Sequence, residues 1–169
     1  MIVRPETPAD RDVIHDLTAA AFARPGQAVA PEAPLIDDLR ADDGYLPALS
    51  LVAVDETGNV IGHVMCTRAV VGGKPVLALG PLGVRPDRQR AGVGSALVHT
   101  VLGAADALGE PLVALLGSPD YYGRFGFRPS TDYGIVAPWG VNFQVRTLSG
   151  YGGGIAGEFR YARPFELMD

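Results

Sequence analysis

The stretch RPDRQRAGVGSAL (residues 85–97) places three arginines and two glycines between two apolar runs, residues 76–84 and 97–108. The first turn of a helix has unpaired N–H groups and a partial positive charge, so a basic loop that opens a helix attracts anions. Glycines let a phosphate approach those N–H groups, and Arg88 and Arg90 add long-range attraction. The stretch therefore predicts a site for a phosphate-bearing ligand, with a solvated surface turn as the alternative.

Two familiar phosphate-binding patterns do not fit this loop. A Walker A loop needs a lysine followed by Ser or Thr after its second glycine, whereas Ser95 follows Gly94 directly. The dinucleotide fingerprint needs Gly or Ala where Leu97 stands, and a turn tight against the strand, whereas residues 85–91 intervene. These differences argue against a nucleotide-binding module.

The segment Gln89-Arg90-Ala91-Gly92-Val93-Gly94 matches the Q/R-x-x-G-x-G/A motif of the GNAT superfamily of N-acetyltransferases. It follows an apolar strand that ends Leu82-Gly83-Val84, and the later segment YYGRFGF (residues 121–127) looks like the family's Y-x-x-x-G-F ending. The resemblance covers nearly the whole chain in element order. Three segments resemble the YhbS-like subgroup of predicted acetyltransferases: SPDYYGRFGFRP, FQVRTL and RYARPFEL.

The resemblance implies that acetyl-CoA is the cosubstrate and that a primary amine attacks its thioester directly. The backbone N–H groups of residues 89–95 would cradle the pyrophosphate, and the strand end would pair with the pantetheine arm as though with an added strand. Tyr122 falls on the position that protonates the departing thiolate. A phenol of pKa about 10 stays protonated at neutral pH and can donate to a thiolate of pKa about 8.5. The implied donor-site residues are Leu82, Gly83, Val84, Gln89, Arg90, Ala91, Gly92, Val93, Gly94 and Ser95.

Length and composition narrow the class of protein. The chain has 169 residues, which suits one N-acetyltransferase domain spanning 1–169. A formal net charge of −5 argues against a general nucleic-acid binder. No stretch approaches the length of a membrane span and the N-terminus has no signal core, so we expect a cytoplasmic protein without a membrane partner. Whether two copies form a homodimer is left open.

Cysteine and histidine point to no metal site. The single Cys66 excludes an internal disulfide, and we expect it to be a small apolar filler. His15, His63 and His99 are scattered without ligand spacing, and we expect His63 to be half-buried in its strand.

Hydrophobic patterning predicts an α/β domain with a mixed, mostly antiparallel central sheet flanked by helices, as in GNAT proteins. Its strand at 76–84 is apolar on both faces and should lie centrally. In the family, this strand and the strand at 112–116 part in a V-shaped opening, and Gly80-Pro81 fits a broken ladder because Pro81 has no N–H. We expect a first helix that begins at Thr7-Pro8-Ala9-Asp10 and further helices at 35–40, 92–108 and 119–125. The other expected strands span 49–54, 60–71, 133–136, 143–147 and 158–161.

The acceptor side is less defined by the sequence. Many relatives carry an acid on the strand before the motif, but residues 76–82 contain none. Glu32, Asp37 and Asp38 lie near the first helices, which usually wall the acceptor pocket, but an acid in such a position is more often a solvated charge. Tyr121 is expected to be a packing aromatic. The acceptor and the general base stay open, and a CoA-binding regulatory protein without turnover is the alternative to an enzyme.

Overall fold

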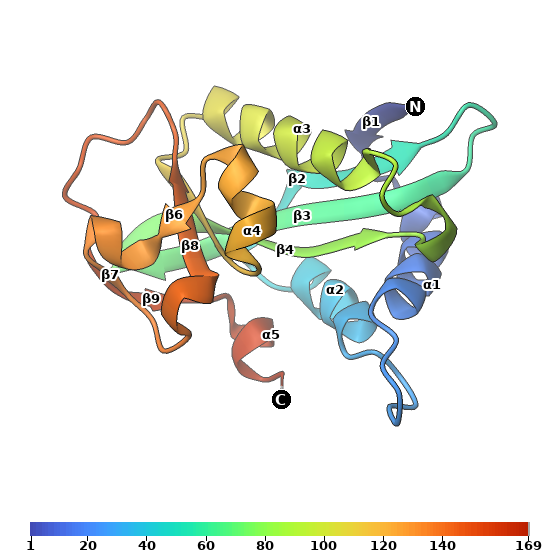
Figure 1. The fold of residues 1–169 in the computed structure, drawn as a ribbon, viewed down its shortest axis with the longest axis horizontal. Coiled ribbons are helices and arrows are strands. Elements are labelled where there is room, and N and C mark those ends of the chain that lie inside the picture. Colours follow the sequence, from blue (N-terminus) through green and yellow to red (C-terminus); the bar gives the residue numbers. More distant parts are fainter. Residues whose placement is uncertain (169) are drawn as a thin grey trace.

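The computed structural model describes residues 1–168, which form one central sheet with helices on both faces (Figure 1). The strand order is β1-β2-β3-β4-β5-β8-β6, and β9 pairs with β3 and β7. Within residues 1–168 only the β4–β5 and β7–β9 pairs are parallel, which confirms the predicted mixed, mostly antiparallel sheet. The strands are β1 (Ile2–Pro5), β2 (Tyr45–Val54), β3 (Val60–Val71), β4 (Lys74–Val84), β5 (Leu112–Leu116), β6 (Arg128–Pro129), β7 (Ile135–Val136), β8 (Phe143–Thr147) and β9 (Gly157–Arg160).

Helix α3 (Val93–Ala107) packs on one face of the sheet, and α1 (Arg11–Ala21) and α2 (Glu32–Arg40) pack on the other (Figure 1). Short helices α4 (Pro119–Tyr122) and α5 (Arg163–Glu166) follow β5 and β9. Successive side chains of a strand point to opposite faces of the sheet. The apolar side chains of β2 and β3 therefore contribute alternately to the core under α3 and to the core under α1 and α2. Cys66 is buried on the α3 side, as predicted, and burial raises the pKa of its thiol.

Several boundaries differ from the sequence prediction. Helix α2 begins at Glu32 and not at residue 35, because Pro34 sits in the first turn, where a missing N–H costs no hydrogen bond. The predicted strand at 133–136 shrinks to β7, since Ser130–Tyr133 forms a 3-10 turn that ends at Gly134 with φ +69°. Helix α5 was not predicted. No helix within residues 1–168 is long and apolar enough to cross a membrane.

The central strands β4 and β5 part soon after they meet. Their only paired positions are Leu77 with Val113 and Ala78 with Ala114, so β4 beyond Ala78 has no strand on that side within residues 1–168. The predicted opening is therefore present.

A β-bulge on β4 lies at the level of this opening. Val64 of β3 pairs with Leu82, but Cys66 pairs with Leu79, so β4 carries one more residue than β3 over this interval. The extra residue falls at the Gly80-Pro81 step, and a bulge of this kind bends and twists its strand. The distortion coincides with the point where β4 leaves β5.

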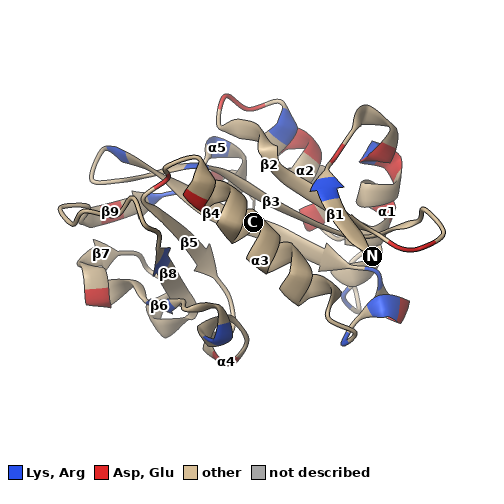
Figure 2. Cartoon of the chain, turned by 90° about the horizontal axis from the view of Figure 1, so that it is seen from above, with Lys and Arg blue, Asp and Glu red and all other residues tan. Residues whose placement is uncertain are grey.

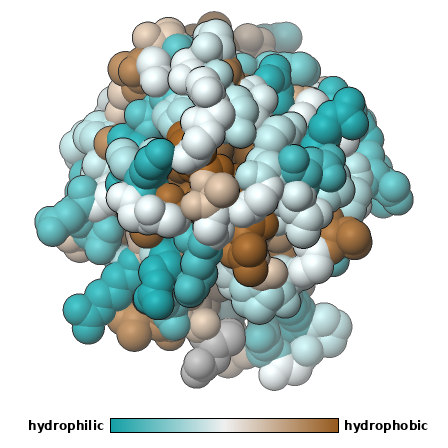
Figure 3. All heavy atoms as spheres, turned by 90° about the vertical axis from the view of Figure 1, so that its left-hand side faces the viewer, coloured by the Kyte–Doolittle hydropathy of each residue, from teal (hydrophilic) through white to brown (hydrophobic). Residues whose placement is uncertain are grey.

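The surface is mostly polar at the end of the molecule that carries β7 and β9. Figure 3 shows this end with teal and white atoms in the majority and brown apolar atoms in separate patches. It offers no continuous apolar surface in this view.

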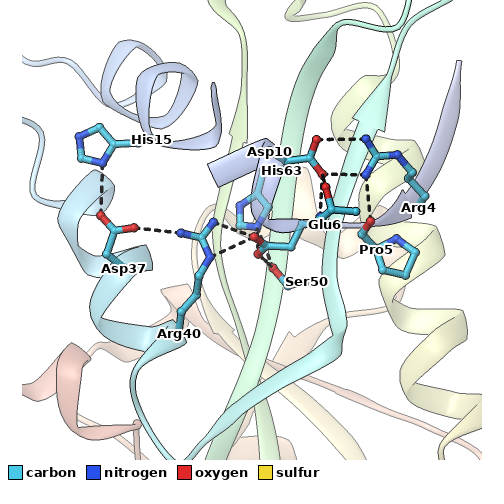
Figure 4. Close-up of polar contacts among 10 residues, drawn as sticks. Arg4, Pro5, Glu6, Asp10, His15, Asp37, Arg40, Ser50 and His63 are labelled. Carbon is cyan, nitrogen blue, oxygen red and sulfur yellow. Dashed lines mark hydrogen bonds and ion pairs between the residues drawn. The ribbon is translucent and has the colours of Figure 1, made fainter. Parts of the chain in front are cut away.

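A buried polar cluster ties β1, β2 and β3 to α2 (Figure 4). His63 is fully buried, not half-buried as predicted, and its Nε2 lies 3.0 Å from Ser50 Oγ. Ser50 in turn donates its hydroxyl proton to Glu6. With that proton used, the His63–Ser50 bond requires a proton on Nε2, which leaves Nδ1 as a buried acceptor without a hydrogen bond in the described structure. Arg40 completes the cluster, with Nη2 2.9 Å from Glu6 Oε2.

The charges of this cluster are fixed by their surroundings. Burial lowers the pKa of His63, so its ring stays neutral in the folded protein. Burial opposes ionisation of Glu6, but hydrogen bonds from His63, Ser50 and Arg40 together outweigh it and lower its pKa to about 2. Arg40 and Glu6 are therefore a buried ion pair, and removal of one partner would leave the other charge uncompensated.

We expect this cluster to make stability fall as pH drops below about 6.5. The unfolded chain takes up a proton on His63 in that range, whereas the folded chain does not because the pKa is lowered. Glu6 adds a second loss, which begins below its ordinary pKa of 4.5 and runs toward about 2. Thermal melts from about pH 7.5 to about pH 5 should show a smaller decrease in Tm for His63→Gln than for the wild type.

The matched control for this experiment is His99→Gln, because His99 is exposed. Its melting temperature should follow the wild-type pH dependence. An unchanged pH dependence in His63→Gln would contradict the assignment of a neutral His63.

Candidate active site

The loop between β4 and α3 is held in an open shape that exposes its backbone. Gln89 Nε2 donates to the carbonyl of Val84 at 3.1 Å, which ties the loop back to the strand end. Arg90 has φ +61°, an uncommon conformation for a residue other than glycine. Gly92 precedes the helix with φ +88°, and a Cβ at this position would meet no atom within 4 Å. The space over Gly92 is therefore open to a ligand.

The first turn of α3 presents free N–H groups without a competing charge. Its first intrahelical bond runs from the Ala96 N–H to the Gly92 carbonyl at 3.0 Å, so the N–H groups of Val93, Gly94 and Ser95 have no helical acceptor. No acidic side chain lies in the first turn. Figure 2 shows α3 in tan for most of its length, with charges on neighbouring turns and helices. The helix start is thus suited to an anion.

A cavity of about 580 Å³ lies over this helix start, within the typical range of about 300–1,000 Å³ for ligand pockets. Arg90 and Arg124 contribute positive charge to its wall, and no acidic residue is among those that line it. The cavity is suited to a phosphate-bearing ligand. It is lined by Ala21, Phe22, Leu82, Val84, Gln89, Arg90, Gly92, Gly94, Ser95, Tyr121 and Arg124.

Arg88 was expected from the sequence to add long-range attraction for an anion, but it does not line this cavity. Its guanidinium lies 3.0 Å from Asp55 in the turn between β2 and β3, so its charge is paired there. Arg85 is likewise paired with Asp87 at 2.6 Å. Of the cations near the helix start, Arg90 was predicted from the sequence. Arg124 was missed because it follows the loop by more than 30 residues.

The end of β4 turns alternate backbone groups toward the opening. The Arg85 N–H donates to the Ile61 carbonyl at 2.9 Å, and Gly83 pairs with His63, two residues further along β3. In an antiparallel ladder the residues between them point their N–H and C=O groups the other way. Leu82 therefore offers its N–H and C=O groups to the cavity and Val84 offers its N–H, because the Val84 carbonyl already accepts from Gln89, whereas the backbone groups of Gly83 point to β3.

The remaining implied donor-site residues lie beside the cavity and do not line it. A Cβ on Gly83 would face α1, with Leu17 nearest at 3.5 Å. Ala91 and Val93 line a separate hollow next to Asp55. Any contact from Ala91 or Val93 to a ligand over α3 would come from the backbone.

Tyr121 is more than the packing residue that the sequence suggested. Its ring lies perpendicular to that of Tyr122, with centroids 4.8 Å apart, so adjacent tyrosines face different cavities. Arg124 lies over the Tyr121 ring at 4.8 Å from its centroid. The Tyr121 hydroxyl would lie 2.8 Å from a Cβ on Gly94, so it occupies the space beside the first turn of α3. Helical spacing alone could not show which tyrosine faced the phosphate loop.

Tyr122 lines a second cavity, of about 380 Å³, on the far side of Leu82. Phe22 and Leu82 belong to the walls of both cavities, so the two meet at the opening between β4 and β5. The Tyr122 ring packs against Gly117, where a Cβ would come within 2.5 Å of the ring. Burial, with a smaller contribution from Tyr121, raises the pKa of Tyr122 to about 12. The phenol is therefore protonated at neutral pH.

Among the acids considered from the sequence, the structure places Glu32 in the second cavity. Asp37 is exposed and pairs with Arg40 at 2.9 Å, and Asp38 lines a shallow hollow near the C-terminus. Within residues 1–168 no three His, Cys, Asp or Glu side chains gather closely enough to hold a metal ion. Glu32 is thus the one of these acids that lines the same cavity as Tyr122.

Comparison with known proteins agrees with this architecture. The acetyltransferase (GNAT) domain family matches residues 2–130. The chain belongs to the GNAT family of N-acetyltransferases. YjhQ of Escherichia coli K12, named an uncharacterized N-acetyltransferase, is 32% identical over 94% of this chain and 90% of its own length. YhbS of the same strain, named in the same way, is 34% identical over 88% of each chain.

Two solved structures share the fold over nearly the whole of this acetyltransferase. The E. coli YhbS structure in complex with CoA has a TM-score of 0.86, with 30% identity, and covers 98% of this chain and 91% of its own. A GNAT acetyltransferase from Brucella melitensis in complex with acetyl-CoA has a TM-score of 0.81, with 31% identity and 97% coverage of each chain.

The Tyr121 hydroxyl should decide whether position 94 tolerates alanine. A helix position ordinarily gains about 1 kcal/mol when Gly is replaced by Ala. In Gly94→Ala, overpacking against the hydroxyl should cancel this gain and cost about 1–3 kcal/mol. Removal of the hydroxyl in Tyr121→Phe leaves the ring carbon at 4.0 Å, an ordinary contact, so Gly94→Ala should be tolerated in that background. Urea denaturation of the four proteins gives the coupling free energy.

Gly103→Ala is the matched control for helix propensity, because Gly103 lies within α3 and a Cβ there meets no atom within 4 Å. It should stabilise both backgrounds equally. The same Gly94→Ala effect with and without the Tyr121 hydroxyl would refute the contact.

Proposed function

We propose that this chain transfers the acetyl group of acetyl-CoA to a primary amine. The observation that carries the proposal is the meeting of two cavities at the gap between β4 and β5, one over a free helix start and the other beside a protonated tyrosine. The complexes of the two relatives with CoA and acetyl-CoA support the choice of donor.

In this proposal the donor lies along the first cavity. The pyrophosphate binds the N–H groups at the start of α3, with Arg90 and Arg124 as charge partners. The pantetheine arm pairs with the outward backbone groups of Leu82 and Val84, as an added strand would. Gly83, Ala91 and Val93 contribute backbone shape and no side-chain contact. The thioester then reaches the level of Phe22, where the cavities join.

The transfer needs no covalent enzyme intermediate. An ammonium carries three hydrogens and the product amide carries one, so nitrogen loses two protons. The first leaves before attack and gives the free amine. The amine forms the C–N bond as the C–S bond breaks, and Tyr122 stabilises the developing thiolate and gives it a proton. The second nitrogen proton then restores the Tyr122 hydroxyl.

Acetyl-CoA binding should depend on the open space at Gly92. Gly92→Glu fills that space and adds a negative charge beside the pyrophosphate, so calorimetry should show a loss of affinity of more than roughly 100-fold, about 2.7 kcal/mol. Gly109→Glu is the matched control, because Gly109 also has a positive φ, of +78°, with open space around it, but follows the other end of α3. Equal affinity of wild type and Gly92→Glu would refute the donor site.

Tyr122→Phe should lower the turnover number roughly 10²-fold or more, the usual value of one positioned proton donor. Acetyl-CoA affinity and the fold should change little, because only the hydroxyl is lost and it acts as charge develops on sulfur. Steady-state kinetics with one accepted amine, beside calorimetry, measures both quantities.

The pH profile gives a second readout for Tyr122. Because its pKa is raised to about 12, the hydroxyl stays protonated, and ionisation of Tyr122 should not reduce turnover until pH approaches that value. Near-normal turnover in Tyr122→Phe would assign the residue a packing role. Donor binding without transfer to any amine would instead favour a CoA-binding protein without turnover.

A further inference from the structure

The second cavity has a wall that the donor motif of residues 89–94 does not supply. Helix α2 contributes Glu32 and Leu35, and the chain after β7 contributes Trp139, Tyr161 and Phe165. The last three lie outside residues 2–130, the part that the GNAT domain family matches. The acceptor side of this chain is therefore built in part by residues that the family match does not cover.

Aromatic rings make up much of this wall. The centroids of Trp139 and Tyr161 are 5.5 Å apart, and Tyr161 stacks on Phe165 at 4.5 Å with an angle of 28° between the rings. Burial raises the pKa of Tyr161 to about 12, so its ring is uncharged. Tyr122 adds a further ring at the junction with the donor cavity. Such a wall favours a flat apolar group, since aromatic pairs gain from edge and offset contacts beyond the area they bury.

Glu32 is the charged group in this wall, and its side chain is only 9% exposed. Arg24 Nη1 lies 2.7 Å from Oε1 and 3.3 Å from Oε2. Only the 3.3 Å contact, to Oε2, has the direction of a hydrogen bond. Oε1 is therefore buried without a hydrogen-bond donor among the described residues. A carboxylate can accept several hydrogen bonds, and this one has unused capacity.

We propose that the acceptor is an arylalkylamine, a primary amine joined to an aromatic ring by a short flexible chain. This inference rests on the proposed function. The ring lies among Trp139, Tyr161 and Phe165, and the ammonium donates to Glu32. Glu32 accepts the first proton from nitrogen, which frees the amine for attack on the thioester, and releases that proton to solvent after transfer.

The volume of the cavity, and the C-terminal segment that covers part of it, favour a small-molecule acceptor over the terminus of a protein. Its volume of about 380 Å³ is near the low end of the range for small-molecule sites, about 300–1,000 Å³. Helix α5 lies beside α2 (Figure 1), and Phe165 packs against the apolar core below α2. The C-terminal segment thus covers part of the cavity beside α2.

The substrate test compares phenethylamine, ethanolamine and a short peptide with a free N-terminus, by release of CoA thiol from acetyl-CoA. Burial of one ring should raise kcat/KM for phenethylamine roughly tenfold to hundredfold over ethanolamine. A higher kcat/KM for ethanolamine or the peptide would overturn this inference and leave the acetyltransferase function intact.

A binding test that requires no turnover separates this inference from the proposed function. Trp139 is the single tryptophan of the chain, so its fluorescence reports on the cavity. The probe is N,N-dimethylphenethylamine, a tertiary amine that cannot form the amide product, with 3-phenylpropanol as an uncharged analogue. The amine should change the Trp139 emission at a lower concentration than the alcohol. No saturable change with the amine would overturn the inference even if acetyl-CoA is turned over.

Two variants distinguish recognition by Glu32 from a purely structural Arg24–Glu32 pair. Glu32→Gln should weaken the amine probe roughly tenfold, abolish its preference over the alcohol and move the acidic limb of the kcat/KM profile. Arg24→Gln removes the same ion pair but frees the carboxylate, so it should retain or improve amine binding. Equal losses in both variants would assign the pair to structure and overturn the role of Glu32. Melting temperatures of both variants check the fold.

Discussion

The end of hydrogen bonding between β4 and β5 is the constraint on which the rest of the molecule depends. The two parallel strands share only two paired positions, after which the β4 bulge at Gly80-Pro81 turns the strand away. A β-strand edge left without a partner in the centre of a sheet exposes backbone groups that need acceptors and donors. Here Leu82 and Val84 present those groups to a cavity. The donor and acceptor cavities meet because the sheet opens between them.

The arginines around the phosphate loop have two roles: some form ion pairs that fix the loop, and others line the ligand cavity. Arg88 pairs with Asp55 and holds the loop against the turn between β2 and β3, whereas Arg85 pairs with Asp87 within the loop itself. Arg90 and Arg124 stay on the cavity wall without an acid beside them there. An unpaired cation next to a free helix start produces a focused positive field, whereas a uniform basic patch would attract polyanions generally. The overall charge of −5 agrees with such a local arrangement.

The buried cluster of Glu6, Arg40, Ser50 and His63 supports the acceptor side from a distance. A buried ion pair contributes little net stability, because desolvation offsets its attraction, but few other arrangements of α2 on the sheet would satisfy these groups. Helix α2 also carries Glu32 at its first turn. Fixing the helix against β1, β2 and β3 thereby fixes the carboxylate beside the Tyr122 cavity.

The sequence by itself determined most of the order of elements, the mixed sheet and the phosphate loop, because periodicity, glycines and helix starts are local features. Only the tertiary structure decided which side chains meet. It paired Arg88 with Asp55, brought Tyr121 and Arg124 to the donor site, and buried His63. It also gathered Glu32 and Trp139, more than 100 residues apart, into one cavity. Such contacts depend on strand register and on the packing of α5 against α2, and neither leaves a periodic signal in the chain.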